Sequence, residues 1–232
     1  MADIRQNLAA VRARIADAAG CAGRDPADIK LVAVSKTHPV PVLLDAIAAG
    51  ASVLGENKVQ EAEAKIAEIG RNAAEWHLIG HLQSNKARKA VQLFDVIHSV
   101  DSLELAQRLE RICFEEGRGE LSVFVHVDLA GEATKSGIDV AGLPELVGYL
   151  TTCERLRFDG LMILPPYFDD PEATRPYFDQ LRRIRDKLAL DGSFAGGDRG
   201  ELSMGMSHDF EVAIEEGSTV VRVGTAIFGE RE

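Results

Sequence analysis

The chain has 232 residues, of which 46% are hydrophobic, and a formal net charge of −11. This length and apolar content suffice for the core of one sizeable domain, and no linker divides the chain. The acidic balance disfavours a broad nucleic-acid surface and anionic membranes, because both partners require clustered Lys and Arg. No apolar run is long enough to span a bilayer and the opening residues lack the apolar core of a signal peptide, so we expect a cytoplasmic protein.

The predicted elements begin with a helix and then alternate between strand and helix. Ile4, Leu8, Val11 and Ile15 recur at helical spacing, which predicts an amphipathic helix that closes the bottom or the side of the fold. Strands are predicted near residues 30–36, 53–57, 75–80, 96–100, 121–129, 156–164, 201–205 and 220–228. Helices are predicted near residues 40–49, 57–69, 84–92, 102–116, 142–152, 172–190 and 208–216.

Eight strands that alternate with helices favour parallel pairing with the helices outside. We therefore expect a single (β/α)8 barrel of the TIM type with an extra N-terminal helix, as one domain over residues 1–232. A closed barrel fits this number of units better than an open doubly wound sheet.

Lys36 ends the apolar stretch of the first predicted strand. Most lysines are exposed, and an exposed loop lysine beside Thr37 is the ordinary interpretation. A lysine held at the end of a buried strand can instead lose hydration and attack an aldehyde as the free amine. Lys36 shares a strand face with Val32 and Val34, but both faces are apolar, so the alternation does not identify the face that lines the interior. Lys36 is a candidate Schiff-base residue.

Other polar residues also follow the ends of predicted strands. They are Asn57 after the second strand, His77 and His81 at the third, Ser207 after the seventh, and Arg222, Gly224 and Thr225 in the eighth. In a TIM-type barrel the functional residues lie at the carboxyl ends of the strands, and phosphate commonly binds after strands seven and eight. We therefore expect these residues to meet Lys36 at one end of the barrel.

The last two predicted strands offer groups for an anion. Ser207 is a plausible helix N-cap, and amides at a helix start attract anions, although a capping role alone is the simpler interpretation. Gly224 permits close backbone approach, and Thr225 offers an amide and a hydroxyl. Arg222 is costly to bury without a partner, which a core carboxylate could provide. Because Arg222 and Gly224 share a strand face, a flat heterocycle that bears a phosphate would satisfy both.

Neither the cysteines nor the histidines form a recognised metal or redox motif. Cys21, Cys113 and Cys153 are widely spaced, which favours reduced, mostly structural thiols. His77 and His81 have the spacing of helical metal ligands, but a glycine lies between them and no helical pattern runs through both. We therefore expect no bound metal.

Several blocks of the sequence resemble the family of pyridoxal phosphate homeostasis proteins. The blocks are residues 32–37, 55–61, 76–86, 98–102, 135–137, 160–162, 202–209 and 222–229, and they occur in the family's order over nearly the whole chain. Those at Lys36, at 80–86 and at 203–207 are the most specific. Lys58 departs from the family pattern, in which many members carry an aromatic residue.

The resemblance implies the barrel of alanine racemases and the cofactor pyridoxal 5′-phosphate (PLP). Lys36 would carry PLP as a Schiff base, and Arg222 would face its pyridine nitrogen. The phosphate would be held by Ser207, Gly224 and Thr225, and the ring would be lined by Asn57 and His77.

Arg222 then bears on the choice between a carrier and an enzyme. An arginine stays protonated near pH 7 and can only donate to an unprotonated pyridine nitrogen, which weakens PLP as an electron sink. Alanine racemases share this arginine but take a second acid/base residue from an additional domain, for which we expect no room in a chain that ends at Glu232.

We therefore expect a PLP carrier for intracellular PLP homeostasis rather than an enzyme, with storage, buffering or delivery of PLP as its role. Its expected partners are PLP and PLP-dependent apo-enzymes as acceptors. A small PLP-dependent amino-acid racemase is the alternative. A barrel enzyme that binds the carbonyl of a phosphorylated metabolite through Lys36 is a third possibility.

Overall fold

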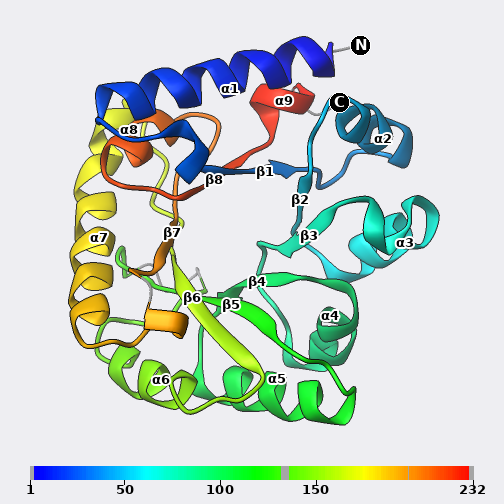
Figure 1. The fold of residues 1–232 in the computed structure, drawn as a ribbon. Helices are drawn as coiled ribbons and strands as arrows, with labels where there is room; N and C mark the ends of the chain where they lie inside the picture. The colour runs from blue at the N-terminus through cyan, green and yellow to red at the C-terminus, as the bar shows by residue number, and fades with distance from the viewer. Residues whose placement is uncertain (1–2, 132–135, 198, 230–232) are drawn as a thin grey trace.

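In the computed structural model, which describes residues 3–131, 136–197 and 199–229, eight strands pair in chain order into a closed barrel (Figure 1). All neighbouring strands are parallel, and β8 pairs with β1 to close the ring. The strands are β1 Lys30–Val34, β2 Val53–Glu56, β3 Glu75–Leu78, β4 Val96–Val100, β5 Leu121–His126, β6 Leu156–Met162, β7 Glu201–Ser203 and β8 Val220–Val223. The predicted (β/α)8 barrel is confirmed. Lys135, in one of the blocks that carry the family resemblance, lies outside the described residues.

Helices cover the outside of the barrel between successive strands (Figure 1). The α-helices are α1 Ile4–Cys21, α2 Val40–Ala48, α3 Val59–Ile69, α4 Ala87–Leu93, α5 Leu103–Glu115, α6 Leu143–Leu150, α7 Arg175–Leu190, α8 Phe210–Glu215 and α9 Thr225–Phe228. Short 3-10 helices occur at Pro26–Asp28, Arg71–Ala73, Ser84–Lys86, Pro171–Thr174 and Ala195–Gly197.

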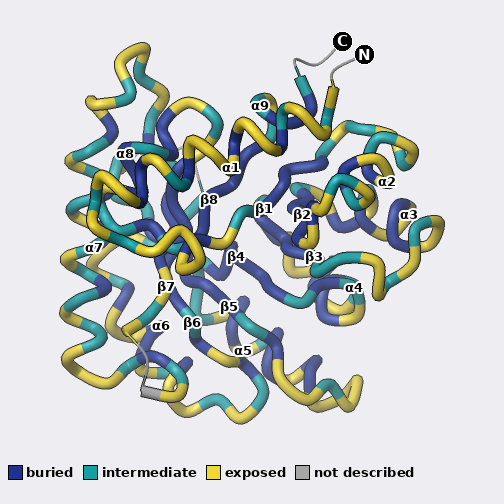
Figure 2. The backbone as a smooth tube through the Cα atoms, turned by 45° about the horizontal axis from the view of Figure 1, so that its top comes forward, coloured by how far each residue is buried: buried dark blue, intermediate teal, exposed yellow. Residues whose placement is uncertain are grey.

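The buried apolar residues form two clusters, one between the strands and the surrounding helices and one inside the barrel. The larger one joins the strands to the inner faces of the helices, and it includes Ala33 of β1. The smaller one includes Val32 and Val34 of the same strand together with Phe124 and Met162. Because side chains alternate along a strand, the smaller cluster fills the barrel interior. Figure 2 shows the strands as buried and the helices as alternately buried and exposed.

The N-terminal helix α1 lies along the side of the barrel next to α8 and α9 (Figure 1). Its predicted apolar stripe is confirmed, because Leu8, Val11 and Ile15 are buried. Asn7 donates from Nδ2 to Ile227 O at 2.9 Å, so the first and last helices are joined directly. The two ends of the described chain therefore stabilise each other at the point where β8 closes against β1.

The eighth strand ends earlier than the predicted range of 220–228. β8 stops at Val223, and Gly224 has φ −116° and ψ −78°, which starts the short helix α9. The Ile227 amide then donates to Gly224 O at 2.8 Å. The apolar run after Gly224 has the composition of a strand but packs as a helix against α1.

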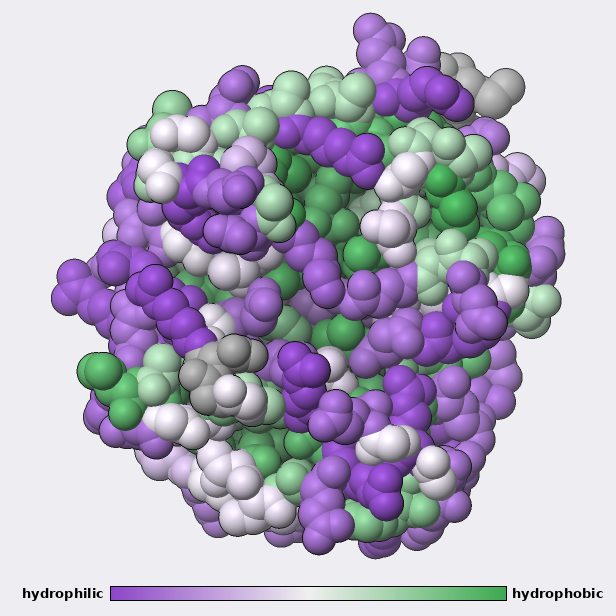
Figure 3. All heavy atoms as spheres, in the orientation of Figure 1, coloured by the Kyte–Doolittle hydropathy of each residue, from purple (hydrophilic) through white to green (hydrophobic). Residues whose placement is uncertain are grey.

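Hydrophilic residues predominate on the face seen in Figure 3, with hydrophobic residues visible mainly in the hollows between them. None of the helices in the described ranges is both long enough and apolar enough to cross a membrane.

Candidate functional site

Lys36 lies in the turn that follows β1, at the carboxyl end of the barrel, and is partly buried. Its neighbour Thr37 has a φ of 69°, a left-handed conformation that a β-branched residue adopts only where the surrounding structure imposes it. Val32 and Val34, on the strand face that Lys36 continues, belong to the interior cluster. The face of β1 that carries Val32 and Val34 therefore lines the interior, and Lys36 follows the end of the strand at the mouth of the barrel.

A buried charged cluster fixes this turn on both sides. The Lys65 ammonium donates to Ser35 O at 2.8 Å and pairs with Glu56 and Glu61, each at 2.7 Å. Ser35 donates from Oγ to Glu56 Oε1 at 2.6 Å, and the Thr37 amide donates to Glu61. Burial raises the pKa of Glu56, against the hydrogen bonds from Lys65 and Ser35 that lower it. The backbone is thus held immediately before and after the lysine.

Asn57 lies at the same end of the barrel, on the segment after β2. Gly55 of β2 pairs with Val34 of β1 on one side and with His77 of β3 on the other, so the residues that follow these strands meet at one edge. A Cβ atom on Gly80 would lie 2.3 Å from Asn57 O. Only glycine permits this close approach, which seats Asn57 against the segment after β3.

Ser207 brings together backbone amides from the segment after β8. Its Oγ accepts from the amides of Gly224 at 3.2 Å and Ala226 at 3.4 Å, with Thr225 between them. A Cβ on Gly224 would lie 3.3 Å from Val34, so the glycine lets this segment lie close to β1. Amides that converge on one oxygen form the kind of concavity that binds a phosphate oxygen. The three residues predicted for phosphate binding are therefore adjacent.

Ser207 is not the helix N-cap that the sequence suggested. Helix α8 begins at Phe210 with Asp209 as its N-cap residue, and Asp209 Oδ1 accepts from the Met206 amide at 2.6 Å. Gly205, with a φ of 92°, makes the turn between β7 and this segment. The helix therefore starts later than predicted, and the Ser207 hydroxyl is used across the barrel mouth instead.

Arg222 lies in the barrel interior and is 3% exposed. Its Nη1 donates to Ser203 Oγ at 2.6 Å and its Nη2 donates to Ile163 O at 2.8 Å. Both acceptors are neutral, so the suggested pairing with a core carboxylate is wrong among the contacts of the described residues. Burial lowers the pKa of Arg222 to about 10, and Asp209 opposes this shift through its charge. The guanidinium is therefore still protonated at pH 7.

Comparison with known proteins assigns the family. The chain matches the model of the alanine racemase N-terminal domain over residues 6–232. It is 44% identical over 232 residues to the pyridoxal phosphate homeostasis protein of Pseudomonas aeruginosa, covering 100% of this chain and 97% of the relative. It is 41% identical to the protein of that name from Aquifex aeolicus, covering 98% of each. The chain belongs to the family of pyridoxal phosphate homeostasis proteins.

A solved structure agrees with this assignment. PipY of Synechococcus elongatus, determined with PLP bound, aligns with a TM-score of 0.84 and 41% sequence identity. The alignment covers 97% of this chain and 100% of PipY. This chain therefore shares the fold of PipY over nearly its full length.

His77 of this homeostasis-family chain lies deeper than a residue at the barrel mouth. Its Nε2 contacts Glu75 Oε1 and its Nδ1 contacts His98 Nε2, each at 2.8 Å. Both ring nitrogens thus have partners inside the barrel, and the side chain lines a crevice at the amino-terminal end. The structure groups the other predicted residues at the carboxyl end, and contact between His77 and a bound ring stays a prediction.

His77 and His81 also do not form a pair. His81 is exposed and contacts Asp101 at 3.3 Å, whereas His77 is 1% exposed. In residues 3–131, 136–197 and 199–229 no group of three or more His, Cys, Asp or Glu side chains is placed to hold a metal ion.

Sequence reasoning did not identify the residues that fix the turn after β1 or those that contact Arg222. Glu56 and Lys65 fix the turn after β1, and Ser203 and His98 lie next to the buried guanidinium. One signal was available, because a glutamate ends the otherwise apolar second strand. The partner of that glutamate comes from a helix, and only the folded structure shows the contact.

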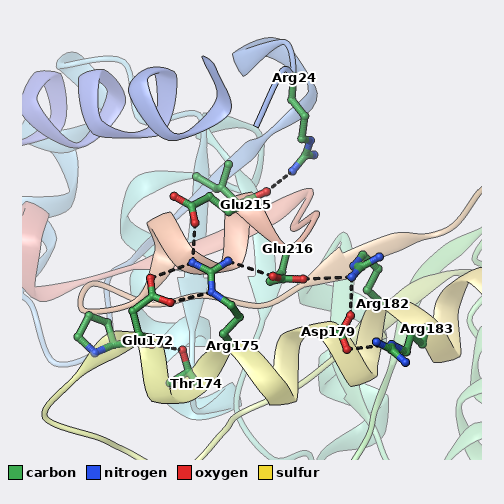
Figure 4. Close-up of polar contacts among 11 residues, drawn as sticks. Arg24, Glu172, Thr174, Arg175, Asp179, Arg182, Arg183, Glu215 and Glu216 are labelled. Atoms are coloured by element: carbon green, nitrogen blue, oxygen red, sulfur yellow. Dashed lines mark hydrogen bonds and ion pairs between the residues drawn. The ribbon is translucent and has the colours of Figure 1, made fainter. Parts of the chain in front are cut away.

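The crevice at the amino-terminal end of the barrel has a volume of about 1710 Å³. The described residues that line it include seven Lys or Arg and seven Asp or Glu. Many of them pair with each other, such as Lys30 with Glu75 at 3.1 Å and Arg182 with Glu216 at 3.2 Å. Figure 4 shows the adjacent ion-pair cluster, in which Arg175 joins Glu216 and two further carboxylates. The large crevice and the convergent donor groups therefore lie at opposite ends of the barrel.

Proposed function

We propose that this protein binds PLP and stores, buffers or delivers it in the cytoplasm as part of intracellular PLP homeostasis. One observation carries the proposal, namely that the Lys36 turn, the Arg222 guanidinium and the amides around Ser207 converge at the carboxyl end of one barrel. The pairing of β1 with β8 places Val32 opposite Arg222, so residues far apart in sequence become neighbours. The names of the curated relatives and the PLP bound to PipY support the proposal.

The groups present fit PLP one by one. Lys36 would hold the cofactor through its amine, the group that reacts with an aldehyde. The amides of Gly224, Thr225 and Ala226 and the hydroxyl of Ser207 supply neutral donors for the phosphate, and the glycine leaves room for its approach. Bound PLP supplies a reactive aldehyde and an electron-accepting ring. The remaining residues of the site orient the ring.

Arg222 fits a carrier, but alanine racemases share this arginine, so the arginine alone does not separate a carrier from a racemase. A guanidinium has donors and no acceptor, so it contacts the ring nitrogen only when that nitrogen is unprotonated. An unprotonated ring withdraws electrons less strongly, which disfavours bond cleavage at the amino-acid carbon. The site would therefore hold the aldehyde while weakening the cofactor as an electron sink.

PLP titration followed by transfer tests the function. We expect the full chain to turn yellow with PLP and to restore the activity of a PLP-dependent apo-enzyme, the proposed class of acceptor. A chain that stays colourless after incubation with PLP contradicts the proposal. Incubation of the loaded protein with L- and D-alanine tests the alternative, since rapid loss of optical activity identifies a racemase.

A further inference from the structure

A line of buried hydrogen bonds crosses the barrel interior, and we name it the Glu75–Arg222 chain. Its contacts are Arg222 Nη1 to Ser203 Oγ at 2.6 Å, Ser203 Oγ to His98 Nδ1 at 2.8 Å, His98 Nε2 to His77 Nδ1 at 2.8 Å, and His77 Nε2 to Glu75 Oε1 at 2.8 Å. The three middle side chains are at most 1% exposed. The chain therefore connects the carboxyl end of the barrel to the amino-terminal crevice, which Glu75 lines.

Each hydrogen bond of the chain can run in one direction only. The hydrogen bond from His77 lowers the pKa of Glu75 to about 2, so the carboxylate only accepts and His77 carries its proton on Nε2. Burial lowers the pKa of both His77 and His98, so both rings are neutral at pH 7. Each Nδ1 is then an acceptor, and His98 donates from Nε2 to His77.

The same logic fixes the hydroxyl at the other end. Since His98 Nδ1 accepts, the Ser203 hydroxyl donates its proton to it and keeps its lone pairs for Arg222. His98 also stacks on Phe124 with ring centroids 4.5 Å apart and planes inclined by 5°, which holds the imidazole in place. All four bonds therefore run from the guanidinium to the carboxylate, and bonds aligned in this way strengthen one another.

The aligned hydrogen bonds of the Glu75–Arg222 chain stabilise the buried Arg222 guanidinium. Burying a cation is costly, and the hydrogen bonds of Arg222 to described residues go to two neutral oxygens, with the charge of Asp209 acting on it without a direct contact. The Glu75–Arg222 chain presents the Ser203 hydroxyl oxygen to the guanidinium as an oriented acceptor. At its other end, it terminates on the Glu75 carboxylate at the amino-terminal side of the barrel. It also fixes one arm of the guanidinium, since Nη1 donates to the oriented Ser203 hydroxyl.

We propose that the Glu75–Arg222 chain is a positioning device, which holds one arm of the guanidinium so that its remaining N–H groups face the ring nitrogen of bound PLP. The ligand in this statement rests on the proposed function. The proton positions within the chain do not, and the two parts can be tested separately.

Nitrogen-15 NMR of the histidine rings tests the proton positions in the Glu75–Arg222 chain, and it does so without PLP. In the full-length protein at pH 7, we expect His77 and His98 to be neutral with the proton on Nε2. A proton on Nδ1 of His98, or a charged ring at either residue, overturns the assigned direction. This result is independent of whether the protein binds PLP.

Two buried serines provide a matched test of positioning. Ser203→Ala removes the acceptor of Arg222, whereas Ser218→Ala removes a hydroxyl that is equally buried but donates only to backbone carbonyls. The ligands are PLP and 1-deaza-PLP, which has C–H in place of the ring nitrogen. We expect Ser203→Ala to weaken PLP binding about tenfold, the usual size for loss of a hydrogen bond to a charged group, and to weaken the deaza analogue much less.

The outcomes separate a positioning role from a structural one. Equal weakening of PLP and 1-deaza-PLP by Ser203→Ala, or a loss selective for PLP in Ser218→Ala, overturns the positioning role while leaving the proposed function intact. Failure of the wild-type chain to bind PLP contradicts the proposed function instead, and the NMR result still decides the direction of the hydrogen bonds.

Discussion

The two ends of the barrel use charge differently. At the amino-terminal end, equal numbers of cations and carboxylates line a large crevice, and pairs such as Lys30–Glu75 satisfy each other. At the carboxyl end, the hydrogen bonds of Arg222 to described residues go to two neutral oxygens, and amides converge on the Ser207 hydroxyl. We therefore propose that the convergent donors at the carboxyl end, and not the larger volume at the amino-terminal end, form the site for an anionic ligand.

The two ends of the barrel are not independent, because buried polar groups of the interior and of α3 hold the residues at the carboxyl end in place. The Glu75–Arg222 chain runs through the barrel interior, while Lys65 of α3 holds the turn after β1 through Glu56.

Lys36→Ala has the largest expected effect, because it removes the amine that bonds to the aldehyde. We expect complete loss of the visible absorbance of bound PLP, with weaker binding still detectable by equilibrium dialysis through the phosphate groups. Lys58→Ala is the control, since Lys58 is an exposed lysine of the neighbouring segment. A variant at Lys36 that keeps the absorbance would place the covalent bond elsewhere.

Lys65→Met tests the support beside the turn. The substitution leaves the buried Glu56 carboxylate without its cation, which costs about 3–5 kcal/mol of the free energy of unfolding. Lys89→Met is the matched control, because the ion pair of Lys89 with Glu63 is exposed and contributes less than about 1 kcal/mol. Urea unfolding measures both values. Equal costs for the two variants would mean that the cluster does not fix the turn.

Acid should destabilise the protein through the histidines of the barrel interior. Burial is the main cause that lowers the pKa of His126 from 6.5 to about 4. Between these two pH values, His126 is protonated in the unfolded chain but neutral in the folded chain. The free energy of unfolding therefore falls as the pH drops from about 6.5 to about 4, by about 3 kcal/mol for this group alone. His77 and His98 act in the same direction.

Urea unfolding near pH 7 and near pH 5 measures this dependence. His126→Gln cannot titrate and should show a smaller fall in stability over the same interval. A variant with the full dependence of the wild-type chain would assign the effect to other groups.

Glu75→Gln has the smallest expected effect and tests whether the amino-terminal end influences the mouth. The variant loses the charge that fixes the direction of the hydrogen bonds, so we expect a mixture of His77 tautomers and a loss of PLP affinity smaller than that of Ser203→Ala. Glu201→Gln is the control, because Glu201 also begins a strand and lines the same crevice. Identical PLP affinities for Glu75→Gln and Glu201→Gln would mean that the amino-terminal end has no influence on PLP binding at the carboxyl end.

The sequence predicted the barrel well because its signals are local. Every predicted strand is present, since apolar runs of strand length alternate with helical stripes along the chain. The exceptions follow from tertiary contacts, such as the run after Gly224, which packs as α9 against α1 instead of extending β8. The N-cap proposed for Ser207 was wrong because its hydroxyl accepts amides from the segment after β8.

The supports of the site could not be predicted, because they depend on the register between strands. Glu56 and Lys65 meet Ser35 only when β1 lies next to β2 and α3 packs outside them. Likewise, Ser203 and His98 come from β7 and β4 and meet inside the closed barrel. Period-two alternation names the residues on one face but not the partners across the interior.

Borohydride reduction of the PLP-loaded full chain, followed by peptide mapping, tests the central claim most directly. Reduction makes the covalent bond permanent, so the label reports which amine held the cofactor. The account predicts a single labelled residue, Lys36, with one PLP per chain. A label on Lys58 or Lys65, or no label in a protein that has turned yellow, would contradict it.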